Sequence, residues 1–298
     1  MRIGYPCINR SVGCSPSRTF RLSSYTDDRL RDTVTANLAC LGKILVYNEN
    51  SHLLFFRITS DLVPFASHPV CTFPWREYFS GEFDEIGTYI RKHGFRISMH
   101  PDQFVLLNTP DEGVLRRSIA DLVYQVQVLD LLGLDSSAKV QIHVGGIYGD
   151  KTAGIDRFVR RYDLLDPSIR SRLVIENDER LYTISDCLAI HEQTGIPVIM
   201  DSFHHSLLNN GEVFADLLGP VRQTWKTADG IPMVDYSSQE PEKRAGAHAE
   251  HIVADNFRQF LATTQPADFD IMLEIKDKET SAIEALGIAK GDPRLFSG

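Results

Sequence analysis

The chain has 298 residues and a formal net charge of −9, because 40 Asp and Glu residues outnumber 31 Lys and Arg residues. Its 43% hydrophobic and 24% charged residues are typical of a globular protein that buries a sizeable core. The acidic balance disfavours a protein that coats nucleic acid through charge alone. It does not exclude an enzyme acting on DNA, since acids that hold divalent cations count as negative in the formal sum.

The five cysteines form no CxxC pair, and their number is odd. We therefore expect neither a disulfide framework nor a cysteine-type zinc site, and we expect a reducing, cytoplasmic environment. No apolar run approaches the ~18 residues of a membrane span, and the first residues, MRIGYPCIN, lack the apolar core of a signal peptide. The sequence thus predicts a cytoplasmic protein that does not bind membranes.

Short apolar, β-branched runs alternate along the chain with longer amphipathic segments. Strands are predicted at residues 2–8, 53–59, 95–100, 139–144, 173–177, 197–202, 232–237 and 270–276. Helices are predicted at residues 27–47, 82–93, 111–133, 184–194, 212–218 and 248–263. This alternation favours a (β/α)8 TIM barrel, usually ~250 residues or more, formed by residues 1–298 as a single domain. A doubly wound open sheet is the alternative, but no glycine-rich phosphate loop follows the first strand.

Histidines and carboxylates stand at the ends of the predicted strands or just beyond them. They are His68, His100, His143, Glu176, Asp201, His204, Asp235, His248 and Glu274. All strands of a parallel barrel end at one face, which holds the active site, so we expect these side chains to converge. Imidazole with carboxylate suits Zn²⁺, Mn²⁺ or Fe²⁺, whereas carboxylate alone suits Mg²⁺ or Ca²⁺. This number of ligands predicts two or three ions, and clustered metals are typical of phosphodiester hydrolysis.

Each of these residues also has a simpler interpretation. A single histidine such as His100 is more often a hydrogen-bonded structural residue, and Glu176 fits a solvated acid at a strand end. Asp201 fits the N-cap of the next segment. Taken together, however, these interpretations require a coincidence at six of eight strand ends, so the joint pattern favours a metal site.

Eight stretches in the same order resemble the UV damage endonucleases, from Gly4 to about Glu279. They read GYPCIN, RITSDLVPFASH, SMHPDQF, QIHVGG, IENDE, MDSFHH, GAHAEHI and MLEIKDKE. That family is similar in fold to endonuclease IV, a (β/α)8 barrel with a trinuclear metal site. The resemblance implies an enzyme with two or three divalent ions, with Mn²⁺ as the first candidate and Zn²⁺, Co²⁺ or Mg²⁺ as alternatives. A monomer would suit DNA that bends around one face of the protein.

The resemblance also implies the reaction. The enzyme would nick damaged double-stranded DNA immediately 5′ to cyclobutane pyrimidine dimers and 6-4 photoproducts, and also at abasic sites. It would leave 3′-hydroxyl and 5′-phosphate ends and so initiate excision repair.

The same resemblance implies a set of ligands. His100 and His143 would hold one ion with Glu176, which would bridge to a second ion. Asp201 and Glu274 would complete the second site. His204 and His248 would hold a third ion, with His68 near the cluster as a ligand, a neighbour of a ligand or a phosphate contact.

Two positions depart from the family pattern. Many members carry Lys-x-His in the seventh strand, where this chain has Met233-Val234-Asp235. Asp235 would replace the histidine ligand, but methionine cannot replace the family's carboxylated lysine, for which Lys226 is a candidate substitute. The family's Gln-Tyr lesion probe is here Gln103-Phe104, which keeps a stacking surface worth ~1–3 kcal/mol per base.

Further DNA contacts are implied around this probe. Tyr5 and Asn9 occupy family positions that line the lesion pocket, although a strand-end turn capped by Asn9 is the alternative. Gly145 and Gly146 would let backbone amides approach a phosphate. Phe104 without the resemblance would be interpreted as a buried loop aromatic. Basic segments at residues 10–21 and 151–161 fit phosphate positioning or plain solvated surface.

Three other functions compete with a UV damage endonuclease. A metal-dependent sugar isomerase or epimerase uses the same barrel, but it needs fewer histidines and no lesion wedge. A non-enzymatic barrel with structural metals would show closed four-ligand sites with cysteines. An endonuclease IV acting at abasic sites is the third alternative.

Overall fold

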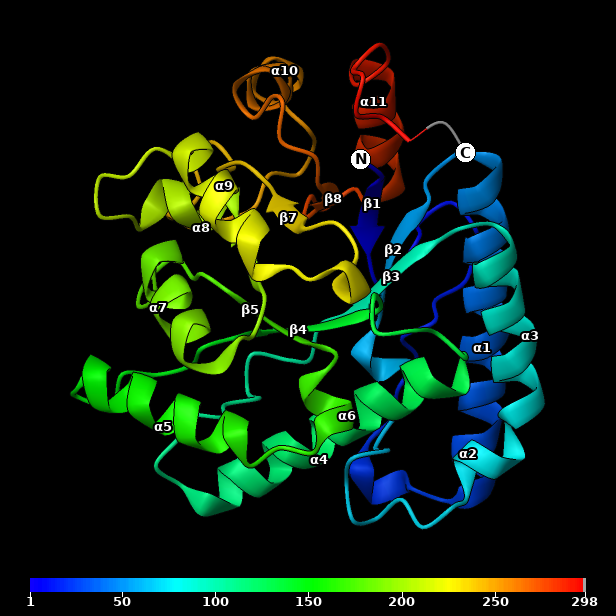
Figure 1. Ribbon diagram of the computed structural model, residues 1–298. Helices are drawn as coiled ribbons and strands as arrows, with labels where there is room; N and C mark the ends of the chain where they lie inside the picture. Colours follow the sequence, from blue (N-terminus) through cyan, green and yellow to red (C-terminus); the bar gives the residue numbers. More distant parts are fainter. Residues whose placement is uncertain (297–298) are drawn as a thin grey trace.

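Eight parallel strands form a closed barrel in the computed structural model, which describes residues 1–296 (Figure 1). The strands are β1 (Ile3–Pro6), β2 (Phe55–Ile58), β3 (Arg96–Met99), β4 (Lys139–His143), β5 (Leu173–Glu176), β6 (Val198–Asp201), β7 (Met233–Tyr236) and β8 (Asp270–Leu273). Each strand pairs with the next one along the chain, and β8 pairs with β1 to close the ring. The predicted (β/α)8 TIM barrel and all eight predicted strands are confirmed.

Helices surround this barrel on its outside (Figure 1). They are α1 (Asp27–Asn50), α2 (Trp75–Tyr78), α3 (Ser80–Lys92), α4 (Glu112–Leu131), α5 (Lys151–Asp163), α6 (Pro167–Arg170), α7 (Ile184–Thr194), α8 (Ser202–Leu207), α9 (Phe214–Thr224), α10 (Ala254–Thr263) and α11 (Glu279–Ile288). Local capping fixes several of their ends: Thr183 and Asp186 form a capping box at the start of α7. None of the helices described for residues 1–296 has the length and apolar character needed to cross a bilayer.

Three helix predictions differ from the structure. The segment at 151–161, interpreted as a basic loop, forms α5, whose Asp150 N-cap accepts a hydrogen bond from the Ala153 amide. The helix predicted from residue 248 begins at Ala254, because His248 pairs instead with Gln239 in an isolated bridge. Helix α9 is shifted to Phe214–Thr224, and it tolerates Pro220 inside it.

Side chains alternate inward and outward along each strand, so the barrel interior is built in layers. One small cluster of buried residues fills the middle of the barrel and is separate from the main core between the strands and the helices. It includes Phe55, Val174, Ile199, Met233 and Met272. The next inward-facing residue after each of these, two positions closer to the carboxyl end of its strand, is charged in every case. Those positions are Arg57, Glu176, Asp201, Asp235 and Glu274.

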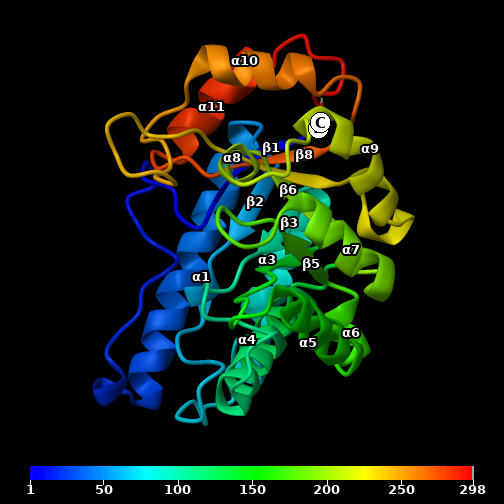
Figure 2. The ribbon, with the colours of Figure 1, turned by 90° about the vertical axis from the view of Figure 1, so that its left-hand side faces the viewer.

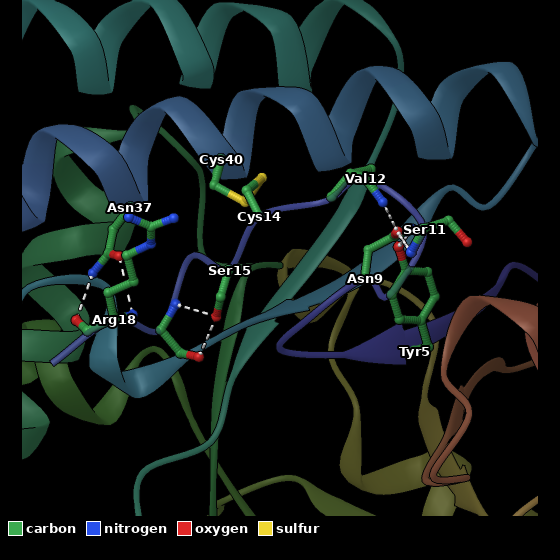
Figure 3. Close-up of a disulfide and its surroundings, with 10 residues drawn as sticks. Tyr5, Asn9, Ser11, Val12, Cys14, Ser15, Arg18, Asn37 and Cys40 are labelled. Carbon is green, nitrogen blue, oxygen red and sulfur yellow. Dashed lines mark hydrogen bonds between the residues drawn. A yellow bond between two sulfur atoms is a disulfide. The ribbon is translucent and has the colours of Figure 1, made fainter.

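One disulfide contradicts the expectation from the cysteine pattern. Cys14 in the β1–α1 loop is bonded to Cys40 in α1, while Cys7, Cys71 and Cys187 are free thiols (Figure 3). The loop runs along α1, and Asn37 of that helix also accepts from the Arg18 amide and donates to the Arg18 carbonyl. The pairing could not be predicted because the sequence does not show that this loop lies against the helix.

Helices α10 and α11 pack side by side next to β8 and β1, as the view in Figure 2 shows. The two ends of the described chain meet, because the Phe296 amide donates to the Met1 carbonyl at 2.8 Å. The ring of strands is thus closed by hydrogen bonds and covered from outside, and its carboxyl end stays open to the loops that carry the candidate site.

Candidate metal centre

Strand register brings the predicted ligands together at the carboxyl end of the barrel. His143 and Glu176 are paired neighbours on β4 and β5, and Asp201 and Asp235 are paired neighbours on β6 and β7. These side chains form two groups, and within each group the candidate ligand atoms lie within 4.8 Å of one another. The groups are His100, His143 and Glu176, and Glu176, Asp201 and His204. Glu176 belongs to both groups, so its two oxygens are placed to join two ions.

Glu176 is the centre of this arrangement. Its Oε2 lies 3.5 Å from His100 Nε2 and 3.7 Å from His143 Nδ1, and its Oε1 lies 3.2 Å from His204 Nδ1. Burial raises the pKa of Glu176, but the positive charge of His143 and hydrogen bonds from His100 and His204 outweigh it. The pKa of Glu176 therefore lies well below its usual range.

Three of the histidines are oriented by backbone carbonyls. The Nδ1 atoms of His100, His204 and His248 lie 2.8, 3.0 and 2.9 Å from the carbonyl oxygens of Pro101, Asn177 and Glu274. Since a carbonyl can only accept, each Nδ1 donates, which leaves Nε2 as the ring nitrogen that would bind a metal once it carries no proton. This arrangement is typical of metal-binding histidines.

Two buried atoms of the predicted ligands have no hydrogen-bond partner within residues 1–296: Asp201 Oδ2 and His143 Nδ1. A buried polar atom without a partner costs free energy, and a metal ion would satisfy both atoms. Burial raises the pKa of Asp201 well above its usual range; the positive charge of His204 opposes this, while Glu176 and Glu274 add to it. These residues fit divalent cations, because added positive charge relieves the repulsion among the carboxylates.

An arginine and a glutamine that sequence reasoning missed also lie in this cluster. Arg57 on β2 is 3% exposed, and it donates to both oxygens of Asp235, to Gln141 and to Glu274. Gln141 on β4 donates to Glu176 Oε2 at 2.5 Å and to Asp235 Oδ2 at 2.6 Å. The sequence does contain a signal for Arg57: it is a single arginine inside the apolar run LLFFRIT, and a buried arginine requires a partner.

A cavity of about 460 Å³ opens over the cluster. Its lining includes Arg57, His100, His143, His248 and Glu274 from the barrel and Gln103 from the β3–α4 loop. Phe104, next to Gln103, is 71% exposed. The interpretation of Phe104 as a buried aromatic is therefore wrong, and the loop presents an aromatic ring to solvent beside the open end of the barrel.

Tyr5 and Asn9 take the structural role that the sequence left open. Tyr5 is fully buried, and its hydroxyl donates to Asn48 of α1 at 2.6 Å. The same hydroxyl accepts from Asn9 at 2.8 Å (Figure 3). The Asn9 side chain accepts from the amides of Ser11 and Val12, which closes a turn. Neither side chain is accessible to DNA in this conformation.

The two glycines after β4 pack against Asn108. Gly145 has a φ of +115°, and an added Cβ would lie 2.3 Å from Asn108 Oδ1. The Gly146 amide donates to the same oxygen at 3.2 Å, and the Gly146 carbonyl accepts from Asn108 Nδ2 at 2.7 Å. Glycine is therefore required here by close packing, and the Gly146 amide that was expected to meet a phosphate is already engaged.

Lys226 lies away from the cluster, and its expected role in the site is wrong. It precedes β7 at the amino end of the barrel, where its backbone amide donates to Asp229. Asp229 in turn contacts Lys139, the first residue of β4. His68 is exposed in the loop after β2 and belongs to neither group of ligands.

Three of the four basic residues of the segment at 151–161 are engaged in contacts within the protein. Lys151 pairs with Asp186, Arg157 donates to the Asn108 carbonyl, and Arg161 binds the carbonyls of Leu107 and Thr109. Arg157 and Arg161 thus anchor the end of the β3–α4 loop to α5.

Comparison with known proteins agrees with this geometry. The model of the family UV-endonuclease UvdE matches residues 1–289. The chain belongs to this family. It is 36% identical over 292 residues to a UV DNA damage endonuclease of Clostridium perfringens, covering 97% of this chain and 71% of that protein. It is 33% identical over 310 residues to the UV DNA damage endonuclease of Bacillus thuringiensis subsp. konkukian, covering 100% and 98%.

Solved structures give the same picture. The crystal structure of SacUVDE superposes with a TM-score of 0.95 at 44% identity, covering 99% of this chain and 100% of that chain. A D-psicose 3-epimerase from Clostridium cellulolyticum H10 superposes with a TM-score of 0.56 at 12% identity, covering 84% and 92%. The second likeness shows the barrel fold alone. This UvdE family member thus shares the barrel with sugar epimerases, while its sequence kinship lies with the DNA repair endonucleases.

Proposed function

We propose that this UvdE family member is a metal-dependent endonuclease that cuts damaged double-stranded DNA immediately 5′ to UV photoproducts. Cyclobutane pyrimidine dimers and 6-4 photoproducts are the main substrates, and abasic sites are a further one. The products carry 3′-hydroxyl and 5′-phosphate ends. The observation that carries the proposal is the shared carboxylate Glu176, which lies in both groups of metal-binding side chains.

His100 and His143 hold one divalent ion with Glu176, and Asp201 and His204 hold a second one, with His248 and Glu274 beside them. Mn²⁺ is the first candidate, because mixed imidazole and carboxylate ligands suit it. Bound at this cluster, such ions polarise a phosphodiester group and lower the pKa of water.

The chain itself places the substrate. Gln103 lines the cavity beside the ligands, and the exposed Phe104 can insert next to a weakened base step. An apolar wedge that unstacks bases meets least resistance where damage has already weakened stacking, which gives lesion selectivity without sequence readout. The anchoring of this loop by Arg157 and Arg161 keeps the wedge at a fixed position relative to the ligands.

A nicking assay tests the proposal. A duplex with one cyclobutane dimer is incubated with the protein and Mn²⁺, beside a lesion-free duplex and an EDTA control. We expect one cut 5′ to the dimer, lost with EDTA and with His204→Gln. The neighbouring His205→Gln is the matched control and keeps the cut, because His205 packs against Phe214 and contacts the Glu212 carbonyl instead of the cluster.

The result that contradicts the proposal is a dimer duplex left intact with Mn²⁺, Co²⁺, Mg²⁺ and Zn²⁺ alike. Equal cutting of the lesion-free duplex would contradict the lesion specificity and leave a metal-dependent nuclease.

A further inference from the structure

The buried guanidinium of Arg57 offsets part of the negative charge of the carboxylates in the cluster. Its Nη2 lies 3.0 and 2.8 Å from the two oxygens of Asp235 and 2.8 Å from Gln141 Oε1. Its Nη1 donates to Glu274 Oε1. Arg57 is 3% exposed and Asp235 is fully buried, so water does not screen this contact.

Both oxygens of Asp235 are occupied without a metal. Oδ2 accepts from Arg57 and also from Gln141 Nε2 at 2.6 Å, and Oδ1 accepts from Arg57. An ion bound to Asp235 would have to displace Arg57. Glu274 would then be the remaining carboxylate that pairs with the Arg57 guanidinium. Asp201, by contrast, keeps a buried oxygen, Oδ2, with no hydrogen-bond partner within residues 1–296, and its nearest charged neighbour is His204 Nδ1 at 3.6 Å. The two aspartates are paired neighbours on β6 and β7, but they differ in their hydrogen bonds. Both oxygens of Asp235 accept hydrogen bonds, whereas Asp201 Oδ2 accepts none within residues 1–296.

The charges support the same distinction. In formal charges, the four carboxylates Glu176, Asp201, Asp235 and Glu274 and the guanidinium of Arg57 sum to three negative charges when the histidines are neutral. Two divalent ions change this to one positive charge, which a single phosphodiester group offsets. A third ion would leave three positive charges in a buried site, which is unfavourable without further anions.

We propose that Arg57 acts as a built-in cation of the site, so that Asp235 is its ion-pair partner and the cluster holds two divalent ions. Gln141 completes the unit, because it contacts Asp235 with the same amide that contacts Glu176 Oε2. Arg57, Gln141 and Asp235 thus position the shared ligand Glu176 and the neighbouring Glu274. This inference rests on the proposed metal dependence and specifies the number of ions.

Metal counting tests the inference without DNA. The protein is saturated with Mn²⁺, freed of excess ion by gel filtration, and assayed by inductively coupled plasma mass spectrometry; free Mn²⁺ during titration is followed by electron paramagnetic resonance. We expect two ions per chain for the wild type and for Asp235→Asn, whose amide oxygen still accepts from Arg57. Asp201→Asn is the matched control at the paired position, and it binds one ion.

Arg57→Met gives the converse result, because it frees Asp235 and Glu274 and raises the count to three. Three ions in the wild type, a lost ion in Asp235→Asn, or two ions in a folded Arg57→Met would each overturn the inference. Circular dichroism establishes which variants are folded, and Asp235→Asn alone keeps the test decisive if Arg57→Met does not fold.

The count also separates this inference from the proposed function. A protein that binds two ions and does not cut dimer DNA contradicts only the function. A protein that cuts the DNA and binds three ions contradicts only the role of Arg57.

Discussion

Both ends of the barrel bury charged side chains, but they compensate them differently. At the amino end, Lys139 contacts Asp229 and the Ser171 carbonyl, and Asp270 pairs with Arg2. At the carboxyl end, four carboxylates face a single arginine. The buried charges at the amino end are paired with one another, whereas the carboxyl end carries more carboxylates than cations, an imbalance that protons or added cations relieve. The same barrel thus has a structural end and a candidate metal-binding end.

The largest effect is expected from removing the charge of the shared ligand. Glu176→Gln keeps the volume of the side chain and should lower Mn²⁺-dependent nicking by at least ~10³-fold, since even partners of metal ligands contribute ~10–100-fold. Thermal unfolding without metal should be unchanged or shifted upward, because one of four clustered carboxylates is gone. Activity within tenfold of the wild type would show that Glu176 does not join the two ions.

At the structural end, Lys139→Met should reduce the free energy of unfolding by ~3–5 kcal/mol, because it leaves Asp229 without its buried cation. Urea unfolding followed by circular dichroism measures this. Lys226→Met is the control: it lies at the same turn but is exposed, and its effect should stay within ~0.5 kcal/mol. Equal losses for both variants would remove the distinction between paired and surface charges.

The rim of the metal-binding end offers a smaller test. Phe104→Ala should weaken binding to dimer-containing DNA by ~1–3 kcal/mol, because the stacking surface is lost. The intact duplex should be bound as before, which fluorescence anisotropy on both duplexes would show. Phe104→Tyr is the matched control and should retain the wild-type preference; equal weakening on both duplexes would contradict a role in lesion recognition.

A further test is the pH dependence of metal binding, which changes the affinity by about tenfold per pH unit. Burial lowers the pKa of His204, but the charges of Asp201 and Glu176 outweigh it and raise the pKa to about 11. At neutral pH the metal-free protein therefore keeps a proton on His204, and an incoming ion must displace it. Mn²⁺ affinity should rise by about tenfold per pH unit from pH 6 to pH 8. A flat profile in isothermal titration calorimetry would contradict this.

The barrel and most of the clustered side chains were predictable because they follow from local patterns. Alternating apolar runs predicted the strands, and a histidine or carboxylate at six of the eight strand ends predicted which face carries the candidate site. The role of Arg57 was not predictable in this way, because its partners Asp235 and Gln141 come from strands that are distant in the sequence. Tyr5 and Gly146 show the converse: their chemistry suited DNA contacts, but packing against Asn48 and Asn108 had already engaged them.

The Cys14–Cys40 bond has a practical consequence for handling the protein. It links two residues that are 26 positions apart, and the segment between them carries Arg18 and begins next to the turn at Asn9. Protein produced in a reducing host would lack this bond, whereas protein exposed to air would contain it. The two forms differ in mass by two hydrogens only, but they would differ in how readily proteases cut this segment. Limited digestion with and without a thiol reductant would distinguish them, and batches of purified enzyme are comparable only when that state is specified.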